Sequence, residues 1–127
     1  MLNQECIRDI LIFIDKNQKH DSSGRPIPFK FSSFCSDETM KEKYDLAEMN
    51  AAIRYLVGKQ MLESQDIDLR TPRIHISQIT AKGYDYLQVV CDDTLWKKLK
   101  SRFGTVFNMA APVAVEHCIT FLLQAVL

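Results

Sequence analysis

The chain lacks a surplus of charge of either sign. Its 127 residues include 16 Lys and Arg and 16 Asp and Glu, so the formal net charge is zero. A protein that binds nucleic acid by neutralising phosphates alone usually carries a basic excess. The balance therefore argues against a nonspecific DNA binder, although it leaves room for a local basic patch.

Paired cysteines and a secretory signal are missing too. The first fifteen residues are charged and amphipathic, which is not typical of a signal peptide. The cysteines form no CxxC pair and have no histidine at ligand spacing, as a structural zinc site would require; they are Cys6, Cys35, Cys91 and Cys118. We therefore expect a cytoplasmic protein with free, mostly core-facing thiols.

Signs of catalysis are absent as well. The four glycines are too scattered for a phosphate-binding loop, and no serine or cysteine stands in a nucleophile elbow. The histidines fall on separate segments and share no short spacing for a metal: His20, His75 and His117. We expect a protein that is not an enzyme and that holds neither a metal nor a cofactor.

Hydrophobic content, by contrast, is that of a folded domain, with 46% hydrophobic and 25% charged residues. A helical stripe predicts a first helix from about Gln4 to Lys19, capped by Asn3. Residues 21–28 are typical of a turn, and residues 29–31 of a short strand. Residues 36–44 are either a short helix capped by Ser36 or Asp37, or a flexible connection.

Asp45 is expected to cap a stronger helix that ends near Gly58. Residues 61–69 and 74–79 predict two strands joined by a turn at 70–73. The apolar stripe of the Asp45 helix is Leu46, Met49, Ile53 and Leu56.

Two more helices are predicted after the hairpin. Thr80 caps one, and Asp92 or Asp93 caps the next; an acidic pair at a helix start is far more often a cap than a catalytic pair. The first should bury Tyr84, Leu87 and Val90 or Cys91. The second should bury Leu95, Trp96, Leu99 and Phe103, with Lys97, Lys98, Lys100 and Arg102 outward.

This order predicts an α+β, mainly α protein: a winged helix-turn-helix with a two- or three-stranded wing and additional C-terminal helices. We assign residues 1–91 to the winged-helix domain and residues 92–127 to a helical extension.

Three segments carry a resemblance that points the same way. They are Arg8–Asp15 (RDILIFID), Ile79–Leu87 (ITAKGYDYL) and Asp92–Trp96 (DDTLW). With the ITxxGxxxL…DDTxW pattern, the chain resembles an uncharacterised family of small winged-helix proteins common in prophages and Gram-positive bacteria. The resemblance covers about residues 1–100 and implies a fold but no activity. Two departures from the family pattern are Ala52, where a histidine is frequent, and Gln60, where a glycine is usual.

Candidate DNA contacts lie on the Asp45 helix and at the wing tip. Asn50 and Arg54 are four residues apart and suit adenine and guanine in a major groove. Lys59 follows the helix, and Arg70 and Arg73 could meet phosphates. A plain solvated surface is an equally good interpretation, because acidic residues occur on the same elements: Asp45, Glu48, Glu63, Asp66 and Asp68.

Residues 109–127 are apolar around most of a helix. Glu116 and His117 near the middle argue against a membrane span, so such a helix must be buried against protein. It either packs over the winged-helix core or joins the same helix of another chain. We favour the second alternative, a homodimer interface formed by Val115, Ile119, Leu122, Leu123 and Val126.

Two functions therefore remain open. The dimer either binds double-stranded DNA, as a prophage regulator would, or it binds a protein, for instance as a phage-encoded factor acting on a host or defence protein. Winged helices do both.

Overall fold

The computed structural model describes residues 3–67, 74–98 and 101 of the chain. Within this part, helices dominate and a small three-stranded antiparallel sheet accompanies them. The expected mainly helical α+β class is confirmed. No helix among the described residues combines the length and the apolar character needed to cross a membrane.

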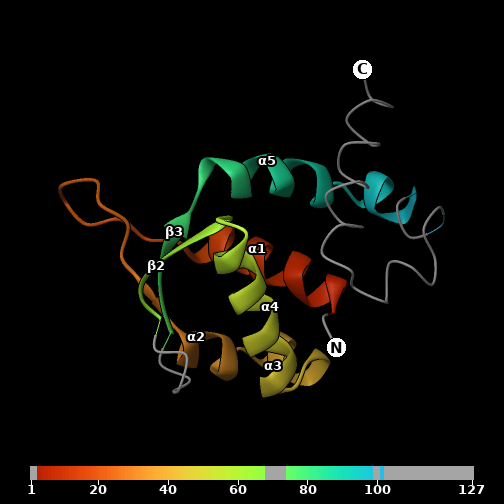
Figure 1. Ribbon diagram of the computed structural model, residues 1–127, viewed down its shortest axis with the longest axis horizontal. Helices are drawn as coiled ribbons and strands as arrows, with labels where there is room; N and C mark the ends of the chain where they lie inside the picture. The colour runs from red at the N-terminus through yellow and green to blue at the C-terminus, as the bar shows by residue number, and fades with distance from the viewer. Residues whose placement is uncertain (1–2, 68–73, 99–100, 102–127) are drawn as a thin grey trace.

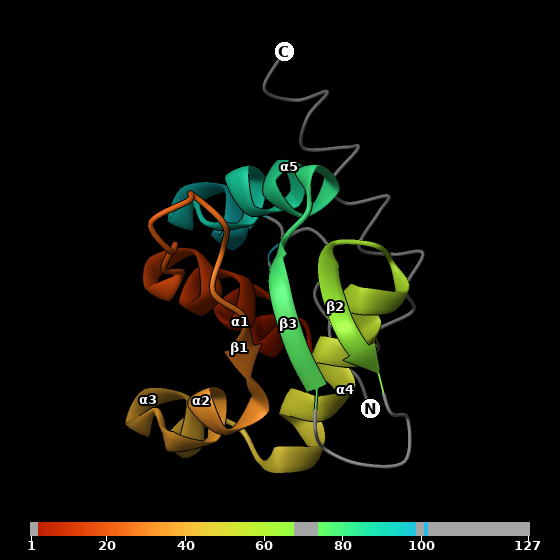
Figure 2. The same cartoon turned by 90° about the vertical axis from the view of Figure 1, so that its left-hand side faces the viewer.

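Helix α1 (Gln4–Asn17) is the central element. It lies between α5 (Ala81–Val90) on one side and the pair α2 (Phe31–Ser36) and α3 (Glu38–Lys43) on the other (Figure 1 and Figure 2). It also contacts α4 (Leu46–Gly58) along its length. The main core therefore surrounds α1.

The sequence of α1 explains its bounds. Asn3 caps the helix, because its Oδ1 accepts a hydrogen bond from the Cys6 amide at 3.2 Å. The helix ends at Asn17, two residues before the predicted Lys19, because Gln18 takes an extended backbone conformation. The predicted stripe is fully buried: Ile7, Ile10, Leu11 and Ile14.

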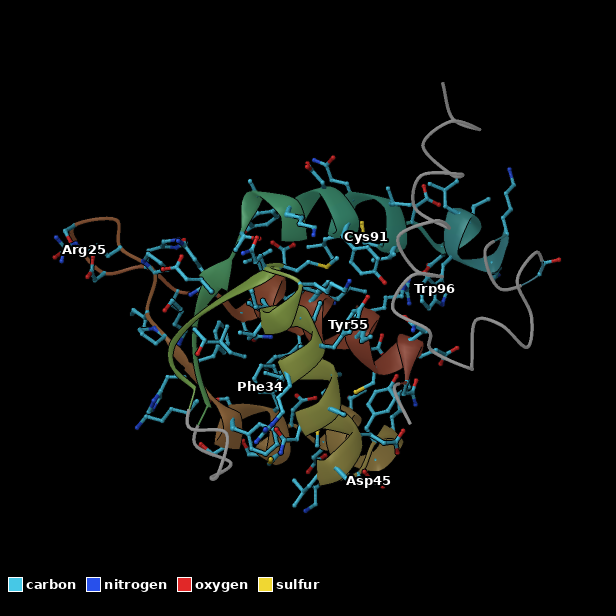
Figure 3. All side chains as sticks on the ribbon, in the orientation of Figure 1. Arg25, Phe34, Asp45, Tyr55, Cys91 and Trp96 are labelled. Atoms are coloured by element: carbon cyan, nitrogen blue, oxygen red, sulfur yellow. The ribbon has the colours of Figure 1, made fainter. Side chains whose placement is uncertain are left out.

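Residues 21–28 form the predicted turn, organised by Asp21. Its Oδ1 accepts hydrogen bonds from the amide and the hydroxyl of Ser23, at 2.9 and 2.7 Å, and from the amide of Arg25 at 3.0 Å. These hydrogen bonds lower the pKa of Asp21, and the bond from the Ser23 hydroxyl makes the largest contribution. Gly24 has a φ of +82°, which favours glycine. Figure 3 shows Arg25 at the tip of this loop, pointing away from the helices.

The predicted strand is shorter than expected. β1 (Phe29–Lys30) has two residues, and Phe31 begins α2 instead of extending the strand. Phe31 and Phe34 are one helical turn apart and are both buried, so a helix places both in the core. Of the two alternatives for residues 36–44, the structure has the helix: Asp37 Oδ2 accepts from the Met40 amide at 3.1 Å and caps α3.

The Asp45 helix forms as predicted and is α4. Asp45 Oδ1 accepts a hydrogen bond from the Glu48 amide at 2.7 Å. The Glu48 side chain in turn accepts a hydrogen bond from the Asp45 amide, which completes a capping box. The prediction for Leu46 is wrong, because its side chain is 60% exposed. Leu46 lies in the first turn, and burial begins only one turn later, with Met49, Ala52, Ile53 and Leu56.

The end of α4 is a Schellman motif. The Gln60 amide donates to the Val57 carbonyl at 3.0 Å, and the Met61 amide donates to the Leu56 carbonyl at 2.8 Å. Gln60 adopts a φ of +60°, the left-handed conformation that this motif requires and that usually selects glycine. The glycine common at this place in the resembling family therefore has a conformational reason.

The predicted hairpin is confirmed for its described residues. β2 (Leu62–Ile67) and β3 (Ile74–Ile79) are antiparallel, and β1 pairs with the other edge of β3, which gives the order β1-β3-β2. The turn predicted at residues 70–73 lies outside the described residues. In Figure 2 the sheet lies beside α1 and leads upward into α5.

Thr80 caps α5 as predicted: its Oγ1 accepts from the Gly83 amide at 3.1 Å and donates to the Gln60 carbonyl at 2.6 Å. The prediction for Tyr84 is wrong, since it is 42% exposed. Gly83 faces the core, and Tyr84 is turned about 100° away from it. The buried positions are Gly83, Tyr86, Leu87, Val89 and Val90, whereas Cys91 is exposed.

A further helix covers residues 93–98. Asp92 Oδ1 caps it, accepting from the amides of Thr94 and Leu95 at 2.9 and 3.1 Å, so the capping interpretation of the acidic pair is confirmed for Asp92. Trp96 is 5% exposed and packs in the core as predicted. Figure 3 shows Trp96 pointing toward the first turns of α1. Lys97 and Lys98 face outward as expected; Leu99, Lys100, Arg102 and Phe103 lie outside the described residues.

Candidate nucleic-acid interface

The candidate base-reading residues face each other on α4. Arg54 Nε donates to Asn50 Oδ1 at 3.0 Å, and both side chains are half-buried. The i, i+4 spacing places the two on one side of the helix, as the sequence predicts. A bond at Nε fixes the plane of the guanidinium. The pair is therefore an ordered polar feature of α4 and not two freely solvated side chains.

Of the remaining candidate cations, the structure describes only Lys59. Lys59 is the C-terminal capping residue of α4 and is half-buried. Arg70 and Arg73 lie outside the described residues, and so does the acidic Asp68. The structure therefore brings Asn50 and Arg54 together, places Lys59 at the end of the same helix, and leaves the wing-tip arginines as predictions.

Three of the acidic residues around this face, Asp45, Glu48 and Glu63, have defined partners. Asp45 and Glu48 form the capping box, and Glu48 Oε2 also accepts from Asn3 Nδ2 at 2.7 Å. Glu63 Oε2 accepts from Gln78 Nε2 at 3.0 Å across the hairpin. Asp45 and Glu48 lie at the first turn of α4, whereas Arg54 lies in its second half. The negative charge is thus concentrated at the N-terminal end of the helix.

The first turn of α4 also exposes apolar surface. Leu46 is among the most exposed large hydrophobic side chains of the described residues, and Ala47 beside it is exposed as well. Figure 3 shows that Asp45, which precedes them, lies at the lower end of α4, next to α3. This end of the helix suits an apolar contact better than a phosphate backbone.

Sequence reasoning missed a polar junction at Arg8. Its Nε donates to the Val90 carbonyl at 2.6 Å, and its Nη2 donates to Asp93 Oδ1 at 2.7 Å. Its guanidinium lies 5.0 Å from the centre of the Trp96 ring. Arg8 thereby joins α1 to the end of α5 and to the 93–98 helix. The signal was available: a charged residue stands next to the buried stripe of α1, within the segment that carries the resemblance.

Asp9 makes a second junction of the same kind. Its Oδ2 accepts from the Tyr44 hydroxyl at 2.6 Å and from Lys43 Nζ at 3.4 Å. Burial raises the pKa of the Tyr44 phenol, and the hydrogen bond to Asp9 raises it further. Two consecutive residues of α1 therefore bind opposite sides of the fold. Arg8 donates a hydrogen bond to the end of α5, and Asp9 accepts hydrogen bonds from the end of α3.

The thiols differ more than expected. Cys6 is fully buried, and burial, with smaller contributions from Glu48, Asp9 and Asp45, raises its pKa to about 12. Cys35 is half-buried and its pKa is raised by desolvation. Cys91 is exposed, and Cys118 lies outside the described residues. The prediction of mostly core-facing thiols therefore holds fully only for Cys6.

Other candidate chemistry is limited. Among residues 3–67, 74–98 and 101, no three His, Cys, Asp or Glu side chains are grouped so that they could hold a metal ion. His20 lies in the loop after α1 and His75 on β3, while His117 lies outside the described residues. The candidate dimer residues Val115, Ile119, Leu122, Leu123 and Val126 also lie outside them.

Comparison with known proteins gives a family but no activity. The family described as "Hypothetical protein (DUF2513)" matches residues 1–105. No curated protein and no solved structure matches the chain. The matched range includes α1, the hairpin, α5 and the Asp92–Trp96 segment, and so both junctions made by Arg8 and Asp9. The chain belongs to this uncharacterised family, DUF2513.

Proposed function

We propose that the protein is a non-enzymatic winged-helix module that binds double-stranded DNA, acting in the cytoplasm as a prophage-associated regulator. Residues 1–91 are the module and residues 92–127 its helical extension. The order of elements supports this: a helix, a short strand, two short helices, the α4 helix and then a hairpin, with β1 pairing to the hairpin strand β3. In such folds the helix before the wing enters the major groove.

The Asn50–Arg54 pair on α4 is the observation that carries the proposal. Arginine contacts guanine and asparagine contacts adenine through paired hydrogen bonds. The 3.0 Å bond between them orients the guanidinium before DNA arrives, which reduces the entropy cost of a base contact. Because the formal net charge is zero, recognition depends on such specific contacts more than on phosphate attraction.

A salt-titrated gel-shift assay with the full chain and fragments of host DNA tests the proposal. Arg54→Ala should weaken binding about tenfold, in line with the loss of one base-reading arginine. Arg25→Ala is the matched control, because it removes the same charge from an exposed loop tip remote from α4. Equal effects of the two variants would contradict base recognition by this face. Binding that barely changes between low and physiological salt would contradict phosphate-driven recognition.

A protein partner is the second candidate, favoured by the exposed start of α4. Leu46 is 60% exposed, next to Ala47 and to the acidic Asp45, where a phosphate backbone would be repelled. On this alternative the module contacts a host or defence protein through this end of the helix. Leu46→Asp should then abolish binding of that protein and leave any DNA binding unchanged. An unchanged partner would exclude this end of α4 as the contact.

The proposed homodimer rests on the apolar residues 109–127. Removing the residues after Asn108 should give monomers or aggregates, because the proposed interface would be lost and any apolar surface that it covers would be exposed. Static light scattering on the full and the shortened chains measures this. A shortened chain that remains a dimer would refute the assignment of the interface to Val115, Ile119, Leu122, Leu123 and Val126.

A further inference from the structure

A groove separates α1 from α3 and shares no residue with the α4 face. Its volume is about 280 Å³, and it is open along one side. Pockets that enclose drug-sized molecules usually measure about 300–1,000 Å³. The groove is therefore suited to one or two side chains of a longer ligand. Its lining residues are Asp9, Ile12, Phe13, Lys16, Asn17, Asp37, Thr39, Met40 and Lys43.

The floor of the groove is apolar and already in place. Phe13 is half-buried, and the centre of its ring lies 5.1 Å from that of Phe34 and 6.2 Å from that of Phe29. Ile12 beside it is also half-buried, and Met40 of α3 lines the groove with 4% of its surface exposed. An aromatic face next to a flexible methionine forms an adaptable apolar surface. The bonds of Tyr44 and Lys43 to Asp9 fix one end of α3 against α1, so the groove need not form on binding.

The charges on the rim favour an anionic ligand. Both carboxylates have partners within the protein: Asp9 accepts from Tyr44 and Lys43, and Asp37 caps α3. No ion pair joins Lys16 to a carboxylate among the described residues, and its side chain is exposed. The groove therefore offers an apolar floor beside an ammonium group that forms no ion pair with any residue that the structure describes.

We propose that this groove binds a short segment of a partner protein in which a bulky apolar side chain is flanked by carboxylates. The apolar side chain lies on Ile12, Phe13 and Met40, and a neighbouring carboxylate meets the Lys16 ammonium. A peptide suits the open shape, because an open groove anchors one side chain while the rest of the segment runs along the surface. The proposal is independent of DNA binding by α4.

Amide NMR spectra of the nitrogen-labelled full chain test it, with N-acetyl-Glu-Phe-Glu-amide as the probe. Peptide anchors of this size bind with a dissociation constant of about 1 mM. We expect shifts confined to residues 9–17 and 37–43. N-acetyl-Lys-Phe-Lys-amide should bind more weakly because of Lys16, and N-acetyl-Glu-Gly-Glu-amide should not bind because it lacks the anchor.

Two variants and one control locate the site. Lys16→Glu should weaken binding about fivefold, as expected for reversing one surface charge. Lys19→Glu is the control, since it makes the same change on an exposed residue outside the groove. Thr39→Trp fills the groove from an exposed position and should abolish binding without affecting the fold.

Three results would overturn the proposal. The first is the absence of localised shifts with the Glu-Phe-Glu probe. The second is equal affinity for the acidic and basic peptides, which would remove the role of Lys16. The third is tighter binding of free N-acetylphenylalanine, which would make the groove a small-molecule site.

Discussion

Arg8 and Arg54 each lie on a long helix, yet their hydrogen-bond partners lie at very different distances along the sequence. Arg8 reaches residues 82 and 85 positions away in the sequence, and its side chain is 15% exposed. Arg54 reaches Asn50, one turn back on its own helix, and is half-buried. We call the first region the α1–α5 junction (Arg8, Val90, Asp93 and Trp96) and the second the α4 face (Asn50, Arg54 and Gly58).

The difference indicates which region serves stability and which can serve binding. Contacts between distant parts of the chain exist only in the folded state, so losing them lowers the free energy of unfolding. A contact within one helix surface contributes much less. The α1–α5 junction and the packing of α5 therefore stabilise the fold, whereas the Asn50–Arg54 bond itself contributes little to stability.

The largest effect should come from a glycine of α5. A Cβ at Gly83 would collide with the Met61 carbonyl oxygen and lie 2.7 Å from Ile79 Cγ2. The Met61 backbone cannot move away easily, because it is part of the packed core. Gly83→Ala should therefore lower the free energy of unfolding by about 3 kcal/mol. Urea denaturation measures the loss. Wild-type stability in this variant would show that α5 does not pack against the start of β2.

Gly58 on the α4 face provides the matched control. A Cβ there meets no atom within 4 Å, and its φ is not in the left-handed region. Gly58→Ala should leave stability unchanged or raise it by up to about 1 kcal/mol, because alanine favours helix. The two substitutions are chemically identical, so the contrast isolates the close approach at Gly83.

Arg8→Ala should have the next largest effect. It removes the donor to the Val90 carbonyl, the bond to Asp93 and the contact with Trp96. An orphaned buried carbonyl and a lost cation–π contact together cost about 2–3 kcal/mol. Chemical denaturation provides the measurement, and Arg25→Ala at the exposed loop tip should change stability by less than about 0.5 kcal/mol.

A substitution at Asp93 separates the contribution of the Arg8–Asp93 ion pair from that of the other contacts of the junction. Its side chain is 85% exposed, so the Arg8–Asp93 pair is largely screened. Asp93→Asn should therefore cost less than about 1 kcal/mol. A loss as large as that of Arg8→Ala would mean that the ion pair, and not the Val90 and Trp96 contacts, holds the junction.

Tyr44→Phe tests the opposite side of α1. Removing the hydroxyl leaves Asp9 with fewer donors and should cost about 1–2 kcal/mol near neutral pH. Folding raises the pKa of Tyr44, so the folded state keeps a proton that the unfolded chain loses near pH 10. Stability from this group is thus complete below about pH 10 and falls as the pH rises above it.

The pH dependence of that variant is the sharper measurement. Urea denaturation across the alkaline range should show wild type and Tyr44→Phe converging, because only wild type loses the tyrosine contribution. Cys6 adds a parallel decline in both proteins from about pH 9 upward, since folding raises its pKa to about 12. A constant difference between the two proteins would mean that Tyr44 is not buried against Asp9.

The sequence predicted the local part of this fold well, because caps and periodicity are local signals. Asn3, Asp45, Thr80 and Asp92 all cap helices as expected. The errors at Leu46 and Tyr84 share a cause: each residue's burial depends on what packs against it, which periodicity does not contain. At Phe31 the error lay in the secondary structure, because a run of three residues is too short to distinguish a strand from the start of a helix. Leu46 fits the stripe of α4 and is exposed because packing begins one turn later.

The candidate site was predictable only in part for a similar reason. The spacing of Asn50 and Arg54 predicted that they share a side of α4, but not that they bond to each other. The partners of Arg8 lie more than eighty residues away, so no local pattern could name them. The sequence showed only that a charged residue, Arg8, stands next to the apolar stripe of an amphipathic helix.

Gln60→Gly should have a small stabilising effect at the end of α4. Gln60 holds the left-handed conformation of the Schellman motif, which costs a residue with a Cβ about 1 kcal/mol. Glycine removes that strain but loses more entropy on folding, so we expect a gain of about 0.5 kcal/mol. Thermal denaturation measures it, and a marked loss would show that the Gln60 side chain contributes contacts of its own.

The smallest effect on stability should come from the α4 face itself. Arg54→Ala and Asn50→Ala should each cost less than about 1 kcal/mol, and their coupling in a double-mutant cycle should be about 0.5 kcal/mol, as for other i, i+4 pairs. Urea denaturation of the four proteins gives the coupling energy. If the coupling instead approached the cost of Arg8→Ala, the Asn50–Arg54 pair would be a structural element like the α1–α5 junction. The contrast between the two arginines would then disappear, and a loss of DNA binding in Arg54→Ala could be explained by damage to the fold.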